Sequence, residues 1–321
     1  MASKADSCGI KLYTFQEVID KGAADSSFKI TPPDTDHCMM FSYTSGTTGD
    51  PKGVKLTHRM ITQMSCAVNM KLGTEIFCEK DCYISYLPSA HSFEQGLFGC
   101  CMIYGMQCGF YSGDPLKLVS DDLPALQPTL FPSVPRLYNR IYGKIKDKLA
   151  LATGIKKTLV DKAVASKLAG LRSSGKVTHC LWDKLVFNKV KAMLGGRVRF
   201  MITGSAPISS DVLDFLKICF CAPIAEGYGM TETSAGSVLT VAGDPLSGHV
   251  GGPVCNVKIR LRDIPEMNYM STSNPPEGEV CFWGPSVMQG YFKNPEKTAE
   301  TVVNGWLYSG DVGRIHPNGS I

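Results

Sequence analysis

The sequence predicts an α/β protein with a doubly wound, mostly parallel sheet and a small antiparallel β element near its C-terminal end. Three observations support this fold class. Apolar runs alternate with stretches of helical periodicity from about residue 38 to 230, an alternation typical of parallel sheets. Hydrophobic residues make up 44% and charged residues 19% of the 321 residues, which is a globular composition. After about residue 245, apolar runs separated by turn residues indicate an antiparallel element.

Short apolar runs that end in Gly, Pro or Ser predict buried strands. Residues from Val134 to Ile145 follow helical spacing, with Arg and Lys on the opposite face, and predict an amphipathic helix. The apolar stretch 96–111 is shorter than the roughly 20 residues that span a bilayer, so it predicts a buried helix followed by a buried strand. The predicted strands are MMFSYT (39–44), CYISYLP (82–88), QCGFYS (107–112), PTLFPS (128–133), RVRFMITG (197–204) and APIAEGYG (222–229).

The C-terminal part changes character. NVKIRLRD (256–263) and GEVCFWG (278–284) are separated by the turn-rich segment STSNPPEG (271–278), and this pattern predicts the antiparallel element.

Charge is distributed unevenly along the chain. The net charge is +4, but from Arg136 to Arg199 there are 16 Lys/Arg against Asp147, Asp161 and Asp183, a local balance of +13. A solvated helical face explains this stretch, and so does a surface that meets anionic lipid or a phosphate-bearing cosubstrate. Nucleic acid is disfavoured as a partner, because aromatic residues are not interleaved with these charges.

The cysteines and the N-terminus indicate the compartment. The 13 cysteines include no C-x-x-C pair and no His at metal-ligand spacing, so they predict reduced, buried thiols and no zinc site. The N-terminus lacks an apolar signal region. We therefore expect a cytoplasmic protein, with a peripheral position on the endoplasmic reticulum or another organelle membrane as a further possibility raised by the basic stretch.

The segment TSGTTGDPKG (44–53) has the composition of a phosphate-binding loop. Its glycines let backbone N–H groups converge on an anion, its hydroxyls add donors, and Lys52 adds a compact positive charge. It follows a predicted strand, as a ligand loop at the carboxyl edge of an α/β sheet does. It is not a Walker A loop, because Pro51 precedes Lys52 and Gly53 follows it.

With this loop, the chain resembles the acyl-adenylate-forming enzymes, and among them the long-chain fatty-acid–CoA ligases. The resemblance covers nearly the whole chain, and its motifs follow one another in the family's order. They are YTSGTTGDPKG (43–53), YLPSAHSFEQ (86–95), the block 113–140, GGRVRFMITGSAPIS (195–209), EGYGMTETSAG (226–236), GHVGGP (248–253), MNYM (267–270), GYFKNPEKT (290–298) and GWLYSGDVG (305–313).

The resemblance implies a reaction in two halves. A long-chain fatty acid carboxylate attacks the α-phosphorus of ATP to give an acyl-adenylate and pyrophosphate, and the thiol of coenzyme A then displaces AMP. The first half requires charge neutralisation, because two anions meet and a third leaves. Mg²⁺ is the implied cofactor, with ATP and coenzyme A as cosubstrates.

The resemblance also assigns roles to residues. In the loop, the hydroxyls and Lys52 would grip the β- and γ-phosphates; Tyr228 would cover adenine and Asp311 would bind ribose. His91 would lie between the phosphate and acyl sites. The implied catalytic residues are Thr47, Lys52, His91, Thr231 and Glu232. The implied nucleotide-binding residues are Thr44, Ser45, Gly46, Thr48, Gly49, Gly204, Ser205, Ala206, Glu226, Gly227, Tyr228 and Asp311, and Glu232 with Thr44 would hold Mg²⁺.

The family pattern also predicts the domain organisation. Residues 1–37 would be a partial N-terminal lead-in, 38–244 an α/β AMP-binding core, and 245–321 a β-rich subdomain. The family's mobile C-terminal domain, which carries a lysine used in adenylation, is expected to be absent from this chain.

Two alternatives to a complete ligase stay open. One is a nucleotide- or acyl-binding form without turnover. The other is an adenylating enzyme for a different carboxylic acid.

Overall fold

The computed structural model describes residues 2–44, 50–73 and 76–321, with side chains from residue 5 onward. The chain forms two compact units, Met1–Asp34 and Thr35–Ile321. The first contains α1 (Ala2–Ser7) and α2 (Phe15–Ala23). Thr14 and Glu17 begin α2 with a capping box, in which each side chain accepts a hydrogen bond from the other residue's backbone N–H. The domain boundaries at 37/38 and 244/245 stay predictions.

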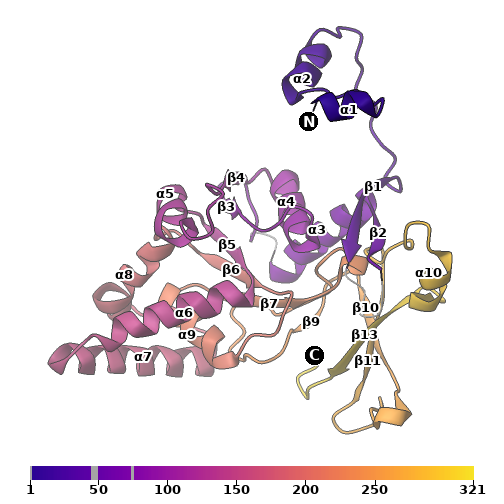
Figure 1. Cartoon of the computed structure of the whole chain (residues 1–321). Helices are drawn as coiled ribbons and strands as arrows, with labels where there is room; N and C mark the ends of the chain where they lie inside the picture. The colour runs from indigo at the N-terminus through magenta and orange to yellow at the C-terminus, as the bar shows by residue number, and fades with distance from the viewer. Residues whose placement is uncertain (1, 45–49, 74–75) are drawn as a thin grey trace. The chain divides into compact units, whose positions relative to one another are not determined.

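The larger unit is built around a seven-stranded sheet (Figure 1). Strands β3, β4, β5, β6 and β7 run parallel, whereas β8 and β9 are added antiparallel at one end. Because β3 lies between β4 and β5, the winding of the chain reverses there, as in a doubly wound fold. The strand order is β4 (Gln107–Phe110), β3 (Cys82–Ser85), β5 (Leu130–Ser133), β6 (Phe200–Thr203), β7 (Ile224–Tyr228), β8 (Val238–Leu239) and β9 (Gly252–Pro253).

Helices cover both faces of this sheet (Figure 1). On one face, α3 and α4 enclose a core that includes Met60, Met64 and Leu97. On the other face, α6, α7 and α9 enclose a second core around Tyr138 and Leu216. The helices of this unit are α3 (His58–Leu72), α4 (Ser92–Tyr104), α5 (Leu123–Leu126), α6 (Pro135–Ala150), α7 (Gly154–Ser174), α8 (Asn188–Lys191), α9 (Ser210–Phe220) and α10 (Pro295–Thr301). Short helical turns are η1 (Leu118–Asp122), η2 (Asp183–Phe187), η3 (Ala192–Leu194), η4 (Thr231–Thr233) and η5 (Pro265–Met267).

A separate four-stranded antiparallel sheet follows, which confirms the predicted antiparallel element. Its first pair aligns Lys258 with Trp283 and Arg262 with Glu279. The strand order is β10 (Lys258–Arg262), β11 (Glu277–Trp283), β13 (Trp306–Arg314) and β12 (Val302–Val303).

The prediction for residues 39–44 is right about the strand but wrong about its sheet. β1 (Cys38–Thr44) pairs antiparallel with β2 (Lys52–Thr57) in a sheet of its own, with Thr44 opposite Lys52. The physical reason is the short connection, since a parallel pair needs a crossover of about a dozen residues or more. β1 and the edge strand β4 are also more exposed than predicted, as are Cys8, Cys38, Cys180 and Cys255.

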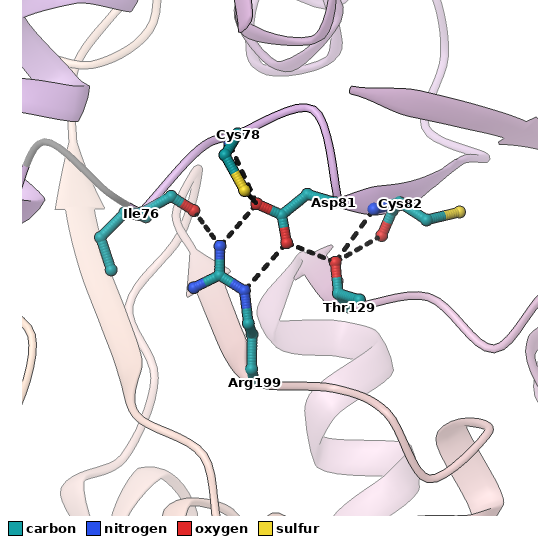
Figure 2. A network of polar contacts seen from close by, with 6 residues as sticks. All are labelled: Ile76, Cys78, Asp81, Cys82, Thr129 and Arg199. Atoms are coloured by element: carbon teal, nitrogen blue, oxygen red, sulfur yellow. Dashed lines mark hydrogen bonds and ion pairs between the residues drawn. The ribbon is translucent and has the colours of Figure 1, made fainter. Parts of the chain in front are cut away.

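An ion pair between the buried Asp81 carboxylate and Arg199, whose side chain is 39% exposed, ties together the amino ends of three parallel strands (Figure 2). Asp81, 1% exposed, binds Arg199 through both carboxylate oxygens, with Oδ1 2.9 Å from Nε and Oδ2 2.5 Å from Nη2. The Thr129 hydroxyl donates to Asp81 Oδ1 over 2.6 Å and accepts from the Cys82 N–H. Asp81 precedes β3, Thr129 precedes β5 and Arg199 precedes β6. Although burial alone would raise it, the pKa of Asp81 is lowered by these hydrogen bonds.

We predict that Asp81→Ala lowers the free energy of unfolding by about 3 kcal/mol, because the Thr129 hydroxyl, the Cys78 N–H and Arg199 lose the buried carboxylate that accepts their hydrogen bonds. Asp36→Ala is the matched control, since the Asp36 carboxylate is about half exposed in its pair with Arg59 and exposed pairs contribute little to stability. Urea unfolding of both variants measures the difference. Equal losses would show that burial of the Asp81 carboxylate gives its hydrogen bonds no additional effect on stability.

Candidate functional site

Most of the predicted phosphate loop lies outside the described residues, including Ser45, Gly46, Thr47, Thr48 and Gly49. Its two flanks are described. Thr44 ends β1 and Lys52 begins β2, and the two face each other across the hairpin. Both residues line a polar cavity of about 440 Å³, together with Glu232, Tyr291 and Tyr308 among others. We call this the polar cavity.

Tyr291 links Lys52 and Glu232 within the polar cavity. Its hydroxyl donates to Glu232 Oε1 over 2.7 Å, and the Lys52 ammonium lies 5.1 Å from the centre of its ring. Burial and the neighbouring Glu232 carboxylate raise the pKa of Tyr291, so the hydroxyl keeps its proton and acts as the donor. The backbone holds this arrangement, because the Phe292 N–H donates to the Gly53 carbonyl and the Met288 N–H to the Glu232 carbonyl.

Tyr291 is a site residue that the sequence reasoning missed. It lies in GYFKNPEKT, a motif noted for its family resemblance without a role for its tyrosine. Its contact with Glu232 joins residues 59 positions apart, which no local pattern reveals.

A second cavity, of about 610 Å³, contains most of the residues predicted to bind the nucleoside. Tyr228 ends β7, and its hydroxyl donates to Asp311 Oδ2 in β13 over 2.7 Å. Burial raises the pKa of Tyr228, which keeps it a donor. We call this the Tyr228 cavity; Ser205, Ala206, Glu226, Gly227, Tyr228 and Asp311 are among the residues that line it.

Glu226 is buried in the wall of the Tyr228 cavity. It is 7% exposed, and its Oε2 has no hydrogen-bond partner among the described residues. Burial raises the pKa of Glu226 to about 7, while the Lys217 ammonium opposes the shift. Lys217 is itself buried, and burial lowers its pKa; its ammonium donates to the Ser247 hydroxyl over 3.0 Å.

Two histidines also lie at the Tyr228 cavity. His249 and His316 both line it, with ring centres 6.4 Å apart. Burial lowers the pKa of His249, against the opposing effect of Asp244. Their approach depends on tertiary structure, because 67 positions separate them in the chain.

A third cavity, of about 240 Å³, is mostly apolar and lies between the sheet and the helices α3 and α4. His91 and Thr231 line it, as do Gly204 and Ser205. His91 also caps α4, because its Nδ1 accepts a hydrogen bond from the Phe93 N–H. Its structural and functional interpretations are therefore compatible. We call this the apolar cavity; its apolar lining includes Met64, Val68, Phe77, Leu97, Cys100, Ile202 and Leu239.

The three cavities meet along one segment, Gly227–Thr231. Gly227 and Gly229 line both the apolar and the Tyr228 cavities, whereas Met230 lines both the apolar and the polar cavities. The arrangement can therefore receive one extended ligand with an apolar part, a flat polar part and an anionic part. The structure brings together the described predicted residues around this segment, from Thr44 and Lys52 to Asp311.

We predict that Glu226→Gln raises the free energy of unfolding by about 3 kcal/mol more at about pH 8 than at about pH 5. The folded pKa of about 7 lies above the ordinary value of 4.5. As pH rises between these values, the unfolded chain releases this proton first, so the wild type loses stability and the glutamine variant does not.

Urea unfolding at the two pH values measures this effect. Glu266→Gln, at an exposed position, is the control and should show no such dependence. An identical pH slope for wild type and Glu226→Gln would contradict the raised pKa.

The chain matches the family model described as AMP-binding enzyme over residues 4–292. It is 43% identical over its whole length to "Long chain acyl-CoA synthetase 6, peroxisomal" of Arabidopsis thaliana, and 44% identical to "Long-chain-fatty-acid--CoA ligase 1" of Homo sapiens. The chain spans 45% of the length of each of these relatives.

Solved structures show the same fold. The N-terminal domain of FACL13 from Mycobacterium tuberculosis aligns with a TM-score of 0.68 at 17% identity, covering 95% of this chain and 65% of that one. The doubly wound fold predicted from the sequence is thus confirmed. With a family model that matches most of its residues, this chain belongs to the AMP-binding enzyme family.

Proposed function

We propose that this chain carries the ATP and acyl-adenylate site of an AMP-forming long-chain fatty-acid–CoA ligase. The observation that carries the proposal is the meeting of the polar, Tyr228 and apolar cavities along Gly227–Thr231. ATP and a fatty acid, the two substrates that form the acyl-adenylate, together have the same three parts: phosphates, a nucleoside and an alkyl chain. The names of the relatives, which are long-chain acyl-CoA synthetases, support the choice of acid.

In the proposed reaction, a carboxylate oxygen of the fatty acid bonds to the α-phosphorus of ATP while the bond to pyrophosphate breaks. The coenzyme A thiol then attacks the acyl carbon, and AMP leaves. Lys52 would neutralise charge on the outer phosphates, and the predicted loop hydroxyls, Thr47 among them, would donate to them. Thr231 and His91 would donate to the oxygens at the reacting end of the apolar cavity.

The nucleoside would lie in the Tyr228 cavity. Tyr228 presents a ring to the base, and Asp311 presents a carboxylate that accepts hydrogen bonds from ribose hydroxyls. Gly204 lies beside this wall, in the apolar cavity, and packs closely on β7, since a Cβ there would lie 3.0 Å from the Gly227 carbonyl oxygen. Ser205, Ala206, Glu226 and Gly227 would complete the wall.

The polar cavity suits Mg²⁺ by its donor chemistry. Within the described residues, no three His, Cys, Asp or Glu side chains gather at one point. Mg²⁺ is commonly held by one or two carboxylates together with substrate phosphates, and Glu232 supplies a buried carboxylate of this kind, with Thr44 beside it. When bound, the ion would neutralise phosphate charge; Tyr291 orients the Glu232 carboxylate for it.

We predict that Lys52→Ala and Glu232→Gln each slow fatty-acid-dependent pyrophosphate–ATP exchange by about two to three decades, the usual effect of removing one charge-stabilising group. Lys189→Ala removes an equal charge at an exposed position on α8 and should leave exchange unchanged. Calorimetry of Mg-ATP binding by the same variants gives a second readout.

The same experiment separates the alternatives. Nucleotide binding without exchange for any acid would favour a binding form without turnover. Exchange driven by short, aromatic or amino acids, and not by long-chain acids, would favour an adenylating enzyme of different specificity. Absence of Mg-dependent nucleotide binding in folded protein would contradict the proposal.

We further propose that the α6–α7 hairpin contacts an anionic membrane, from which a water-insoluble fatty acid can be drawn. Among the described residues, no helix is both long and apolar enough to cross a bilayer. Several charges of the basic stretch are already paired, as Arg199 is with Asp81 and Lys167 with Asp183. At the turn between α6 and α7, however, Leu151 and Ile155 are each 81% exposed. Exposed lysines surround them at 144, 146, 148, 156, 157 and 162, and of these Lys157 pairs with Asp161.

We predict that Leu151→Ser/Ile155→Ser reduces sedimentation with phosphatidylcholine vesicles containing phosphatidylserine by about tenfold, since each buried side chain contributes about 1.5–3 kcal/mol before ordering costs. Leu246→Ser, which alters an exposed leucine elsewhere, should have no effect. Binding of the wild type should weaken with added salt. Failure of the wild type to sediment at low salt would remove this proposal and leave the ligase proposal intact.

A further inference from the structure

We propose that Phe77 limits the length of the acyl chain and that the Asp81–Arg199 ion pair holds it in position. This inference rests on the proposed function, because it takes the apolar cavity as the acyl site. Phe77 lies between α3 and β3 and is 3% exposed. No motif in the sequence marks it.

The apolar cavity runs along the parallel strands. At one end are His91, which follows β3, and Gly204, which follows β6, so this end lies at the carboxyl edge of the sheet. Phe77 lines the same cavity but precedes β3 in the chain. A ligand whose carboxylate reacts near His91 would therefore extend its alkyl chain towards Phe77 and the amino edge.

Phe77 separates the apolar cavity from a second space. A void of about 10 Å³ lies among Phe77, Tyr83, Met106, Leu130 and Phe200. Leu97, Ile202 and Phe77 itself line both spaces. Since the walls of the void are apolar, truncation of the Phe77 ring would join the two spaces and extend the apolar cavity between α4 and the sheet.

The backbone on both sides of Phe77 is anchored by one ion pair (Figure 2). Arg199 Nη2 donates to the Ile76 carbonyl over 2.5 Å. The Cys78 N–H donates to Asp81 Oδ2 over 3.0 Å. Arg199 thus holds the peptide group before Phe77, and Asp81 holds the one after it. Thr129 fixes the ion pair to the sheet. Because its backbone is held on both sides, the Phe77 ring would block the end of the apolar cavity to a longer alkyl chain.

The matched control is another phenylalanine nearby. Phe98 lies on α4, the helix whose Leu97 lines the cavity, but its own side chain is 43% exposed. Phe98→Ala therefore removes the same ring from the same neighbourhood without altering the cavity.

The experiment measures binding of saturated fatty acids, of even length from octanoate to eicosanoate, by competition with a fluorescent fatty acid. Wild-type affinity should rise with each added methylene and then level off or fall at a limiting length. In Phe77→Ala the limit should move to longer acids, and each newly buried methylene should add up to about fourfold in affinity. Phe77→Leu, which leaves a smaller gap, should give a smaller shift and guards against loss of folding. Phe98→Ala should keep the wild-type profile.

Arg199→Lys tests the positioning role. Lysine keeps a charge for Asp81 but lacks the planar guanidinium that binds Asp81 and the Ile76 carbonyl together. We expect Arg199→Lys to bind longer acids than the wild type does, with a less sharp limiting length, while short acids bind as before. A purely structural role for Arg199 would instead weaken binding of all acids in proportion.

The outcomes separate this inference from the proposed function. Binding of long-chain acids with the same length limit in wild type, Phe77→Leu and Phe77→Ala would overturn the role of Phe77 alone. No binding of any acid by folded wild-type protein would overturn the acyl site and, with it, this inference.

Discussion

The backbone from Tyr228 to Ser237 turns back on itself so closely that Gly229 has no room for a side chain. A Cβ at Gly229 would lie 1.6 Å from the Ala235 carbonyl oxygen. Two hydrogen bonds close the turn: the Ala235 N–H donates to the Met230 carbonyl, and the Ser237 N–H donates to the Tyr228 carbonyl. The three cavities share this turn as a wall, and their relative positions depend on it.

The turn also determines which chemical groups face each cavity. Tyr228, before it, points its hydroxyl at Asp311 on the small sheet. Glu232, after it, receives the Tyr291 hydroxyl on the side of the hairpin that carries Lys52. Between them, Gly229 and Met230 leave an apolar wall towards α4. One short segment therefore faces three cavities of different chemistry, with a polar group at each of its ends and an apolar wall between them.

The strands were predicted from local pattern, whereas the site residues were assigned through the family resemblance. The strand that contains Tyr228 and the strand before Gly204 could be recognised from their apolar runs, and a parallel sheet gathers the loops that follow such strands at one edge. Pairing of β1 with β2 could have been predicted from loop length, since the connection is too short for a crossover. Tyr291, His249 and His316 could not, because each reaches its cavity through contacts between segments far apart in the chain.

The two ends of the parallel strands have different physical tasks in the proposed ligase. Charge and hydrogen-bond donors gather at the carboxyl ends, where His91 and Gly204 lie and the loops have room for a ligand. At the amino ends, the buried Asp81 carboxylate accepts hydrogen bonds from Arg199, Thr129 and Cys78, and these bonds hold the ends of the strands together. In the proposed ligase, the cavity that runs between these edges has the reacting groups at its carboxyl end and the Phe77 ring at its amino end. Substitutions at Phe77 can change the length of ligand accepted while the reacting groups keep their geometry.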